Sequence, residues 1–207
     1  MTCGFFCART PARVGPAAPP IAMPPRPLIA VIGSGTTAPG EPPHDMARAV
    51  GAALAEAGCD LLNGGMAGVM AASAEGFARA RETAPADSPA AGGRVIGLTP
   101  GGASAGNRWL DIVIPTGLGH LRNALIARAE AVVAIGGGAG TLSELALAWI
   151  HDRPIIGLRV GGWSEELAGR RLDDRERTGL GADDQIHPAD DAAHVLRLLR
   201  GWKLVGR

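Results

Sequence analysis

Residues 131–141 read AVVAIGGGAGT, five apolar residues followed directly by a glycine-rich loop. A continuously apolar run of this length is typical of a strand that is buried on both faces of a sheet. The residues that follow the loop, up to Ile150, have the pattern of a helix. The stretch therefore predicts a strand, a tight loop and a helix, which is the unit that parallel α/β sheets repeat.

The same alternation extends in both directions from this unit. Prolines 42 and 43 predict a helix start, and the spacing of Met46, Val50 and Leu54 predicts one helical face. Strands are expected at residues 28–32, 60–62, 95–98, 112–114, 131–135 and 154–158; helices are expected at 42–57, 67–81, 118–128, from the glycine loop to 150, and at 189–200. Residues 161–184 are polar and predict irregular structure. The pattern as a whole predicts a single α/β domain with a doubly wound, mostly parallel, Rossmann-like sheet.

The N-terminal segment differs from the rest of the chain. Residues 1–27 carry seven of the 16 prolines, three arginines and no acidic residue. Such a segment cannot bury a core, so we expect a disordered extension at 1–27 and a ligand-binding domain at 28–203. Two explanations of the extension stay open. The lack of acidic residues is compatible with an organelle-targeting segment, but serines and an amphipathic period are missing. The simpler explanation is an extended or misassigned start, with Met23 as a natural beginning just ahead of the first strand.

The composition argues against several classes of function. The 207 residues include 20 basic and 20 acidic side chains, and this zero net charge argues against nucleic-acid binding through phosphate contacts. The only lysine, Lys203, is badly placed for a pyridoxal-phosphate Schiff base or a P-loop. The sequence contains no run of 18 apolar residues, so it offers no membrane span. Its three cysteines provide no disulfide framework. We therefore expect a cytoplasmic protein without a metal site.

Three of the predicted strands end in glycine clusters, and a parallel sheet brings such strand ends to one edge. The clusters are Gly33/Gly35, Gly64/Gly65 and residues 136–140. The loop at 136–141 is suited to a phosphate, because glycines allow close backbone approach and the next helix directs its N–H groups at an anion. The alternative is a tight turn in which the glycines only relieve steric clashes.

A dinucleotide site is a weaker interpretation of the first cluster. Residues 33–38 fit the fingerprint G-x-G-x-x-G/A, but prolines separate the motif from the helix that should begin inside it. Asn63 also stands where an acidic residue would bind a ribose. A nicotinamide cofactor is therefore not expected.

Three polar side chains have both a functional and a structural interpretation. Arg122 could bind a phosphate or carboxylate through its two-pronged guanidinium, or could simply be solvated. Glu144 could act in catalysis, or could form a capping box with Thr141 at the start of the helix. His120 could be an acid or base, although a histidine in a loop is usually a surface residue.

Several motifs in order resemble the superfamily of the Lonely Guy phosphoribohydrolases, long mislabelled as lysine decarboxylases, and of the molybdenum cofactor carrier proteins. Its signature P-G-G-x-G-T-x-x-E resembles residues 136–144, GGGAGTLSE, and further matches are Gly33-Ser34-Gly35, residues 63–70 and residues 115–119. The hydrolases have proline where this chain has Gly136, usually a second glutamate at Ser143, and E-R-K where it has Leu121-Arg122-Asn123. These departures resemble the carrier branch.

The resemblance implies two functions. As a carrier, the protein would store or transfer a phosphorylated pterin-type cofactor, the molybdenum cofactor, without turnover. As a phosphoribohydrolase, it would release base and ribose 5-phosphate from a nucleoside 5′-monophosphate, with Arg122 and Glu144 on the catalytic pair; a carboxylate there could stabilise an oxocarbenium-like state. The predicted ligand-binding residues are Gly33, Ser34, Gly35, Gly64, Gly65, Arg122, Asn123, Gly136, Gly137, Gly138, Gly140 and Thr141.

The resemblance also implies partners. Such proteins commonly form dimers through helices beside the sheet, so we expect a homodimer or a higher homo-oligomer. For a carrier, a molybdoenzyme or a cofactor-insertion protein is the expected recipient. No nucleic-acid or membrane partner is expected.

Overall fold

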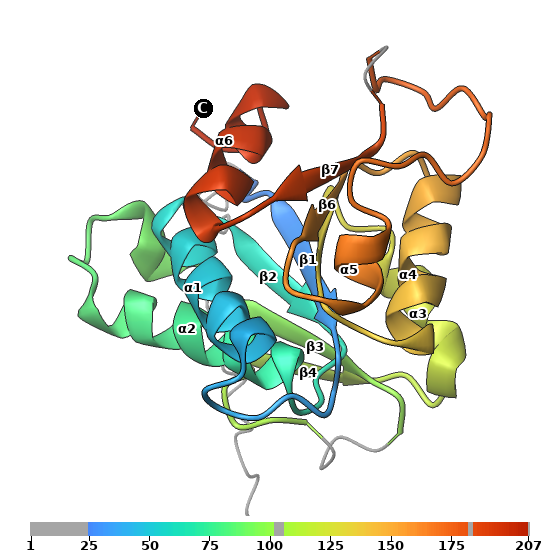
Figure 1. Cartoon of the computed structure of the whole chain (residues 1–207). Coiled ribbons are helices and arrows are strands. Elements are labelled where there is room, and N and C mark those ends of the chain that lie inside the picture. The colour runs from blue at the N-terminus through green and yellow to red at the C-terminus, as the bar shows by residue number, and fades with distance from the viewer. Residues whose placement is uncertain (1–24, 102–105, 182–183, 207) are drawn as a thin grey trace, which may run out of the picture.

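A seven-stranded parallel sheet forms the centre of the structure, a computed structural model that describes residues 25–101, 106–181 and 184–206 (Figure 1). The strand order is β4-β3-β2-β1-β5-β6-β7, and each neighbouring pair is parallel. The strands are β1 Leu28–Gly33, β2 Asp60–Asn63, β3 Val95–Thr99, β4 Ile112–Pro115, β5 Ala131–Ile135, β6 Ile155–Leu158 and β7 Ile186–Ala189. The predicted single-domain, Rossmann-like sheet is confirmed, and it is entirely parallel in this part of the chain. Of the predicted extension at 1–27, residues 1–24 lie outside the described residues.

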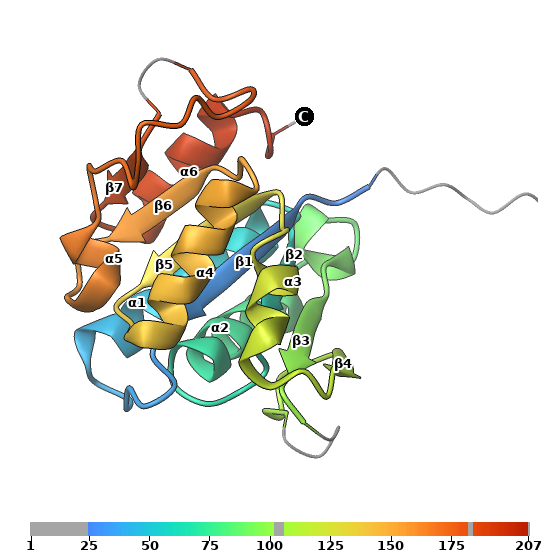
Figure 2. The same ribbon diagram turned by 90° about the vertical axis from the view of Figure 1, so that its right-hand side faces the viewer.

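Helices cover both faces of the sheet (Figures 1 and 2). One layer contains α1 Pro42–Glu56, α2 Val69–Thr83, the 3₁₀ helix η1 Pro89–Gly92 and α6 Ala192–Gly201. The other contains the 3₁₀ helix η3 Gly119–Arg122, α3 Asn123–Ile126, α4 Ala139–Ile150 and α5 Gly162–Glu166. As predicted, prolines occupy the first positions of α1.

The central strands explain the apolar runs of the sequence. In β5 every residue is buried; Ala131 and Val133 pack in the core beneath α1 and α2, whereas Val132 and Ala134 pack in the core beneath α4. Alternate residues of a strand point to opposite faces, so a strand covered on both sides must be apolar throughout.

The order in which strands are added to the sheet reverses between the neighbouring strands β1 and β5. Strands β2 to β4 extend the sheet on the side of β1, and strands β6 and β7 extend it on the side of β5. The chain leaves β1 toward α1 on one face and leaves β5 toward α4 on the other. In doubly wound sheets this divergence opens a crevice at the carboxyl ends of the two strands. The glycine clusters therefore lie at the position where such folds bind ligands.

Three parts of the chain differ from the sequence prediction. The helix predicted at 118–128 is instead η3 followed by the single turn α3. The irregular stretch expected at 161–184 contains the short helix α5. The edge strand β7 falls partly where a loop and the start of the last helix were expected. No helix among the described residues is long and apolar enough to cross a membrane.

Candidate ligand-binding site

The loop after β5 presents a row of free backbone donors. The N–H of Gly136 donates to Ser164 Oγ at 2.7 Å, and the N–H of Leu142 makes the first helical bond, to Gly138 O at 3.0 Å. Between them, the N–H groups of residues 137–141 donate to no acceptor in the described part of the chain. They lie at the N-terminus of the 12-residue helix α4, whose dipole adds positive potential. Backbone donors in this arrangement are able to bind an anion.

The loop glycines distinguish between a ligand-binding loop and a tight turn in which glycine only relieves steric clashes. Gly136 and Gly137 have φ of +64° and +96°, so the turn itself requires glycine there. Gly138 and Gly140 have no such requirement, and a Cβ at either position would meet nothing within 4 Å. Backbone conformation therefore explains the first two glycines. It does not explain Gly138 and Gly140, which face open space.

The loop after β1 lies beside this space and is fastened to α2. Gly33 packs against the carbonyl of Ile135, where a Cβ would clash. Ser34 O accepts the N–H of Val69 at 2.9 Å, and Ser34 Oγ accepts the N–H of Thr36 at 3.2 Å. Gly35 is exposed at the edge of the sheet. The first glycine cluster is thereby brought next to the end of β5, where the third cluster begins.

The loop after β2 is shaped by Asn63, which is fully buried. Its Nδ2 donates to Met70 O at 2.9 Å, and its Oδ1 accepts the N–H of Gly65 at 2.8 Å. Both ends of the amide are therefore used to hold the loop. Gly64 lies under the guanidinium of Arg122, because a Cβ there would be only 2.6 Å from Nη1.

Arg122 is a buried cation whose guanidinium is not satisfied by hydrogen bonds among the described residues. It is 7% exposed, and its Nε and Nη1 have no hydrogen-bond partner among the described residues. Burial lowers the pKa of its guanidinium, and the nearby Glu144 carboxyl opposes that shift. Buried donors are almost always satisfied, so this orphaned guanidinium favours an anionic ligand.

Glu144 lies near Arg122 but does not form an ion pair with it within 4.0 Å in the described structure. The residue is 8% exposed, and burial raises the pKa of its carboxyl to about 7, with Arg122 opposing the rise. The capping-box interpretation is wrong. The N-cap of α4 is Gly138 and receives no side-chain bond, which places Thr141 and Glu144 inside the helix.

Asn123 joins the two helices that border the site. Its Nδ2 donates to Ser143 Oγ at 2.7 Å and to Gly140 O at 3.4 Å, and Ser143 Oγ donates to Gly140 O at 2.7 Å. The amide nitrogen of this predicted ligand-binding residue is thus occupied inside the protein. His120 is exposed at the start of η3.

The segment that supports the glycine loop, residues 161–164, was not predicted from the sequence. The N–H groups of Trp163 and Ser164 donate to the carbonyls of Gly137 and Gly136 at 3.2 and 3.1 Å. Ser164 is fully buried and donates from Oγ to Leu158 O at 2.6 Å. The pair Gly161-Gly162, in a stretch considered irregular, was the available signal.

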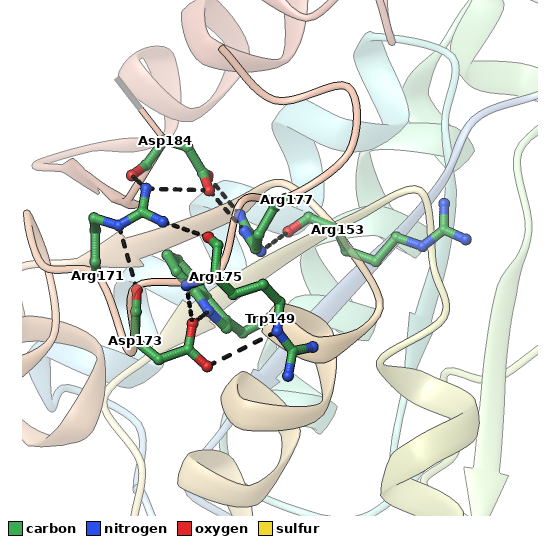
Figure 3. Close-up of polar contacts among 7 residues, drawn as sticks. All are labelled: Trp149, Arg153, Arg171, Asp173, Arg175, Arg177 and Asp184. Carbon is green, nitrogen blue, oxygen red and sulfur yellow. Dashed lines mark hydrogen bonds and ion pairs between the residues drawn. The ribbon is translucent and has the colours of Figure 1, made fainter. Parts of the chain in front are cut away.

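A second missed network fixes the far end of α4 (Figure 3). Arg177 forms a two-pronged pair with Asp184 at 2.8 and 2.7 Å and lies 3.8 Å from the centre of the Trp149 ring. Trp149 Nε1 donates to Asp173 at 2.8 Å. The segment after α5 is therefore clasped to the helix that begins at the glycine loop. No cluster of metal-ligating side chains is present among the described residues.

Comparison with known proteins identifies relatives of this chain. A family model described as the SLOG cluster4 family matches residues 26–186. An uncharacterised protein of Archaeoglobus fulgidus is 36% identical over 132 residues, which cover 63% of this chain and 79% of that protein. The molybdenum cofactor binding protein of Rippkaea orientalis is 29% identical, with a TM-score of 0.67 over 86% of this chain and 98% of that chain. The molybdenum cofactor carrier protein of Chlamydomonas reinhardtii is 30% identical, with a TM-score of 0.66 over 86% and 99% of the two chains.

These similarities confirm the resemblance to the Lonely Guy-like superfamily and to its carrier branch. The family model spans well over half of the sequence. The chain therefore belongs to the SLOG cluster4 family.

Proposed function

We propose that the protein binds, and stores or transfers, a phosphorylated pterin-type cofactor, the molybdenum cofactor. The free N–H groups of residues 137–141 carry the proposal, because an anion such as a phosphate can accept several of them at once. The similarity to cofactor-binding and carrier proteins over nearly their whole length supports the choice of cargo.

The remaining residues of the site fit such a ligand. With the phosphate at residues 137–141, the loops at Gly33–Gly35 and Gly64–Gly65 would form the floor beneath the heterocycle. The unpartnered guanidinium of Arg122 would meet a second electron-rich group of the ligand. A carrier needs binding without turnover, so in this proposal Glu144 serves as a wall of the cleft and takes no part in chemistry.

The test is purification of the full chain from a host that makes the cofactor. We expect the purified protein to yield the fluorescent oxidation product of the cofactor, form A, together with stoichiometric molybdenum. Recovery of a bound nucleotide with neither signal would overturn the proposal.

A phosphoribohydrolase is the second candidate, favoured by the proximity of Arg122 and Glu144. Its weakness is electrostatic. A carboxyl with a pKa of about 7 is partly neutral at physiological pH, and only its ionised form stabilises an oxocarbenium-like state. At the position where the hydrolases usually have a second glutamate, Ser143 is engaged by Asn123 and Gly140.

The two functions are separated by assaying base release from adenosine monophosphate and its N6-isopentenyl form. If release occurs, Glu144→Ala should abolish it while the protein remains folded. No release from either nucleotide would contradict the hydrolase.

We also propose that two copies associate through the α3–α4 face, defined here as the exposed Leu118, Leu121, Leu125 and Ile150 with the half-buried Leu142 and Ala146. The two helices lie side by side in Figure 2. The only charged residue of α4, Glu144, is buried, so the outward surface of this helix is uncharged. A surface helix normally has a polar outer face, and its absence indicates an interface.

A second copy is the occupant that this face fits. Leu142 and Ile150 lie four residues on either side of Ala146, along one ridge of the helix. A two-fold axis at Ala146 would set each large side chain against its counterpart from the other copy, which is the self-complementarity of an isologous interface.

The cytoplasmic location and a molybdoenzyme or insertion protein as recipient remain proposals.

A further inference from the structure

Segment 161–164 makes four backbone-directed contacts with the glycine loop. Gly162 approaches so closely that a Cβ would lie within 2.8 Å of the backbone of Gly136 and Gly137. The carbonyls of both glycines accept N–H bonds from this segment, and the N–H of Gly136 donates to Ser164 Oγ. No other part of the described chain contacts the loop backbone through so many hydrogen bonds.

These bonds determine which way the loop amides point. All peptide bonds in the described structure are trans, so the N–H and C=O of one peptide unit point in opposite directions. The carbonyls of Gly136 and Gly137 are directed at residues 163 and 164. The N–H groups of Gly137 and Gly138, which belong to the same two peptide units, must therefore point away from this segment. They are two of the free donors described above.

Ser164 holds the arrangement in place from within the core. Its hydroxyl accepts from Gly136 at 2.7 Å and donates to Leu158 O at 2.6 Å, so it links the end of β6 to the end of β5. Both bonds are fully buried, where water cannot replace them. A loop with two residues at positive φ has no regular secondary structure to hold its peptide planes, and this hydroxyl supplies the constraint.

We propose that Ser164 is a positioning residue of the anion site: its hydroxyl fixes the Gly136 amide to the end of β6 and thereby keeps the loop in register with the backbone N–H groups of Trp163 and Ser164, which hold the carbonyls of Gly137 and Gly136 away from the ligand. The N–H groups of Gly137 and Gly138 are in this way presented to the ligand. The inference rests on the proposed binding of a phosphate group at this loop. It adds a residue that touches no ligand and that the family signature at 136–144 does not contain.

The test is a titration of the ¹⁵N-labelled full chain with inorganic phosphate, followed through the backbone amide signals of residues 136–141. In the natural protein we expect these signals to shift on addition of phosphate and the Gly136 amide to exchange slowly with solvent. In Ser164→Ala and in the nearly isosteric Ser164→Cys we expect phosphate affinity to fall on the order of tenfold and Gly136 exchange to accelerate.

Ser73→Ala is the matched control. Ser73 is also fully buried and donates from Oγ to a backbone carbonyl, that of Met70 at 3.1 Å, but this bond lies within α2 and involves no residue of the glycine loop. We expect its phosphate affinity to stay within about twofold of the natural protein. Unfolding in urea is measured for each variant, so that affinity is compared at known stability.

The outcomes are distinct. An unchanged phosphate affinity in folded Ser164→Cys, or an equal loss in Ser73→Ala, would overturn the positioning role. Failure of the loop signals to respond to phosphate in the natural protein would instead contradict the phosphate site itself, and that result is seen before any variant is made.

Discussion

Glu144 brings a titration near neutral pH into the cleft. Burial raises the pKa of its carboxyl from 4.5 to about 7. Below pH 4.5 the group is neutral in both folded and unfolded chains. Between these two values the unfolded chain releases the proton more readily, so stability decreases as pH rises, by up to about 3 kcal/mol once pH exceeds 7.

Glu144→Gln should remove this dependence. We expect the variant to gain stability relative to the natural protein as pH rises from about 5 to 8, measured by urea unfolding at each pH. Glu56→Gln, at an exposed position of α1, is the control and should follow the natural protein. A Glu144→Gln difference that is constant over this range would show that the carboxyl keeps an ordinary pKa.

Replacing Arg122 should affect the stability of the fold and the affinity for phosphate differently. Replacing it with Met removes a buried charge whose Nε and Nη1 have no hydrogen-bond partner among the described residues, so we expect stability to be unchanged or to rise by about 1 kcal/mol. Phosphate affinity should fall at least tenfold in the same variant. The control is Arg48→Met on the exposed side of α1. A loss of several kcal/mol in Arg122→Met would mean that the guanidinium is satisfied within the fold.

At this scale, sequence patterns identified residue types more reliably than residue roles. Arg122 and Glu144 follow from the motif, and the structure places them together. The interpretation of Thr141 as the N-cap is wrong. The N-cap is Gly138, which has no side chain, and sequence patterns for capping rely on a side chain that accepts a hydrogen bond. The role of Ser164 could not be predicted, since it depends on a contact across 28 residues.

Among the elements, the segment after α5 contains a buried carboxylate, that of Asp184, which pairs with Arg177 and also lies 3.6 Å from Nη1 of Arg171. Asp184 accepts two hydrogen bonds from Arg177, which hold the pKa of its carboxyl below its usual range. This stability is present at neutral pH and is lost as pH falls through that lowered pKa. Asp184→Ala leaves Arg177 buried without its partner, and we expect a cost of about 3 kcal/mol.

Urea unfolding at pH 7 measures that cost, and Asp174→Ala, at an exposed position of the same segment, should cost little. Phosphate affinity should be preserved in Asp184→Ala, because Arg177 packs on Trp149 near the C-terminal end of α4, whereas the glycine loop lies at the N-terminal end of that helix. A small stability change would show that this clasp is not needed to hold the segment.

Elements with strong internal patterns were predicted well, and elements set by their neighbours were not. The buried strands β1 and β5 and the proline-initiated helix α1 follow from their own residues. Strand β7 reads IHPA, with a proline that only an edge strand tolerates, and its pairing with β6 defines it. The helix predicted at 118–128 is interrupted early, because Gly117 and Gly119 adopt positive φ around the turn into η3.

At the scale of the whole molecule, the α3–α4 face should decide the oligomeric state. Leu121 is 76% exposed, so Leu121→Glu should leave the fold intact while placing a charge in the proposed interface. By light scattering coupled to gel filtration we expect a dimer for the natural protein and a monomer for the variant. Ala193→Glu, on the exposed side of α6, should remain dimeric. A natural protein that is monomeric at micromolar concentration would contradict the proposed interface.

The position of β1 has a consequence for how the chain reaches this structure. Strand β1 is flanked by β2 on one side and by β5 on the other, and Ile29 pairs with Ala131, about a hundred residues later. During synthesis, β1 to β4 emerge first and carry an open apolar edge until β5 arrives to close it. Pairings of such long range are slow to form, so we expect refolding in milliseconds to seconds by stopped-flow fluorescence. A chain that ends before residue 131 should aggregate rather than fold, since its most apolar strand has lost one of its two neighbours.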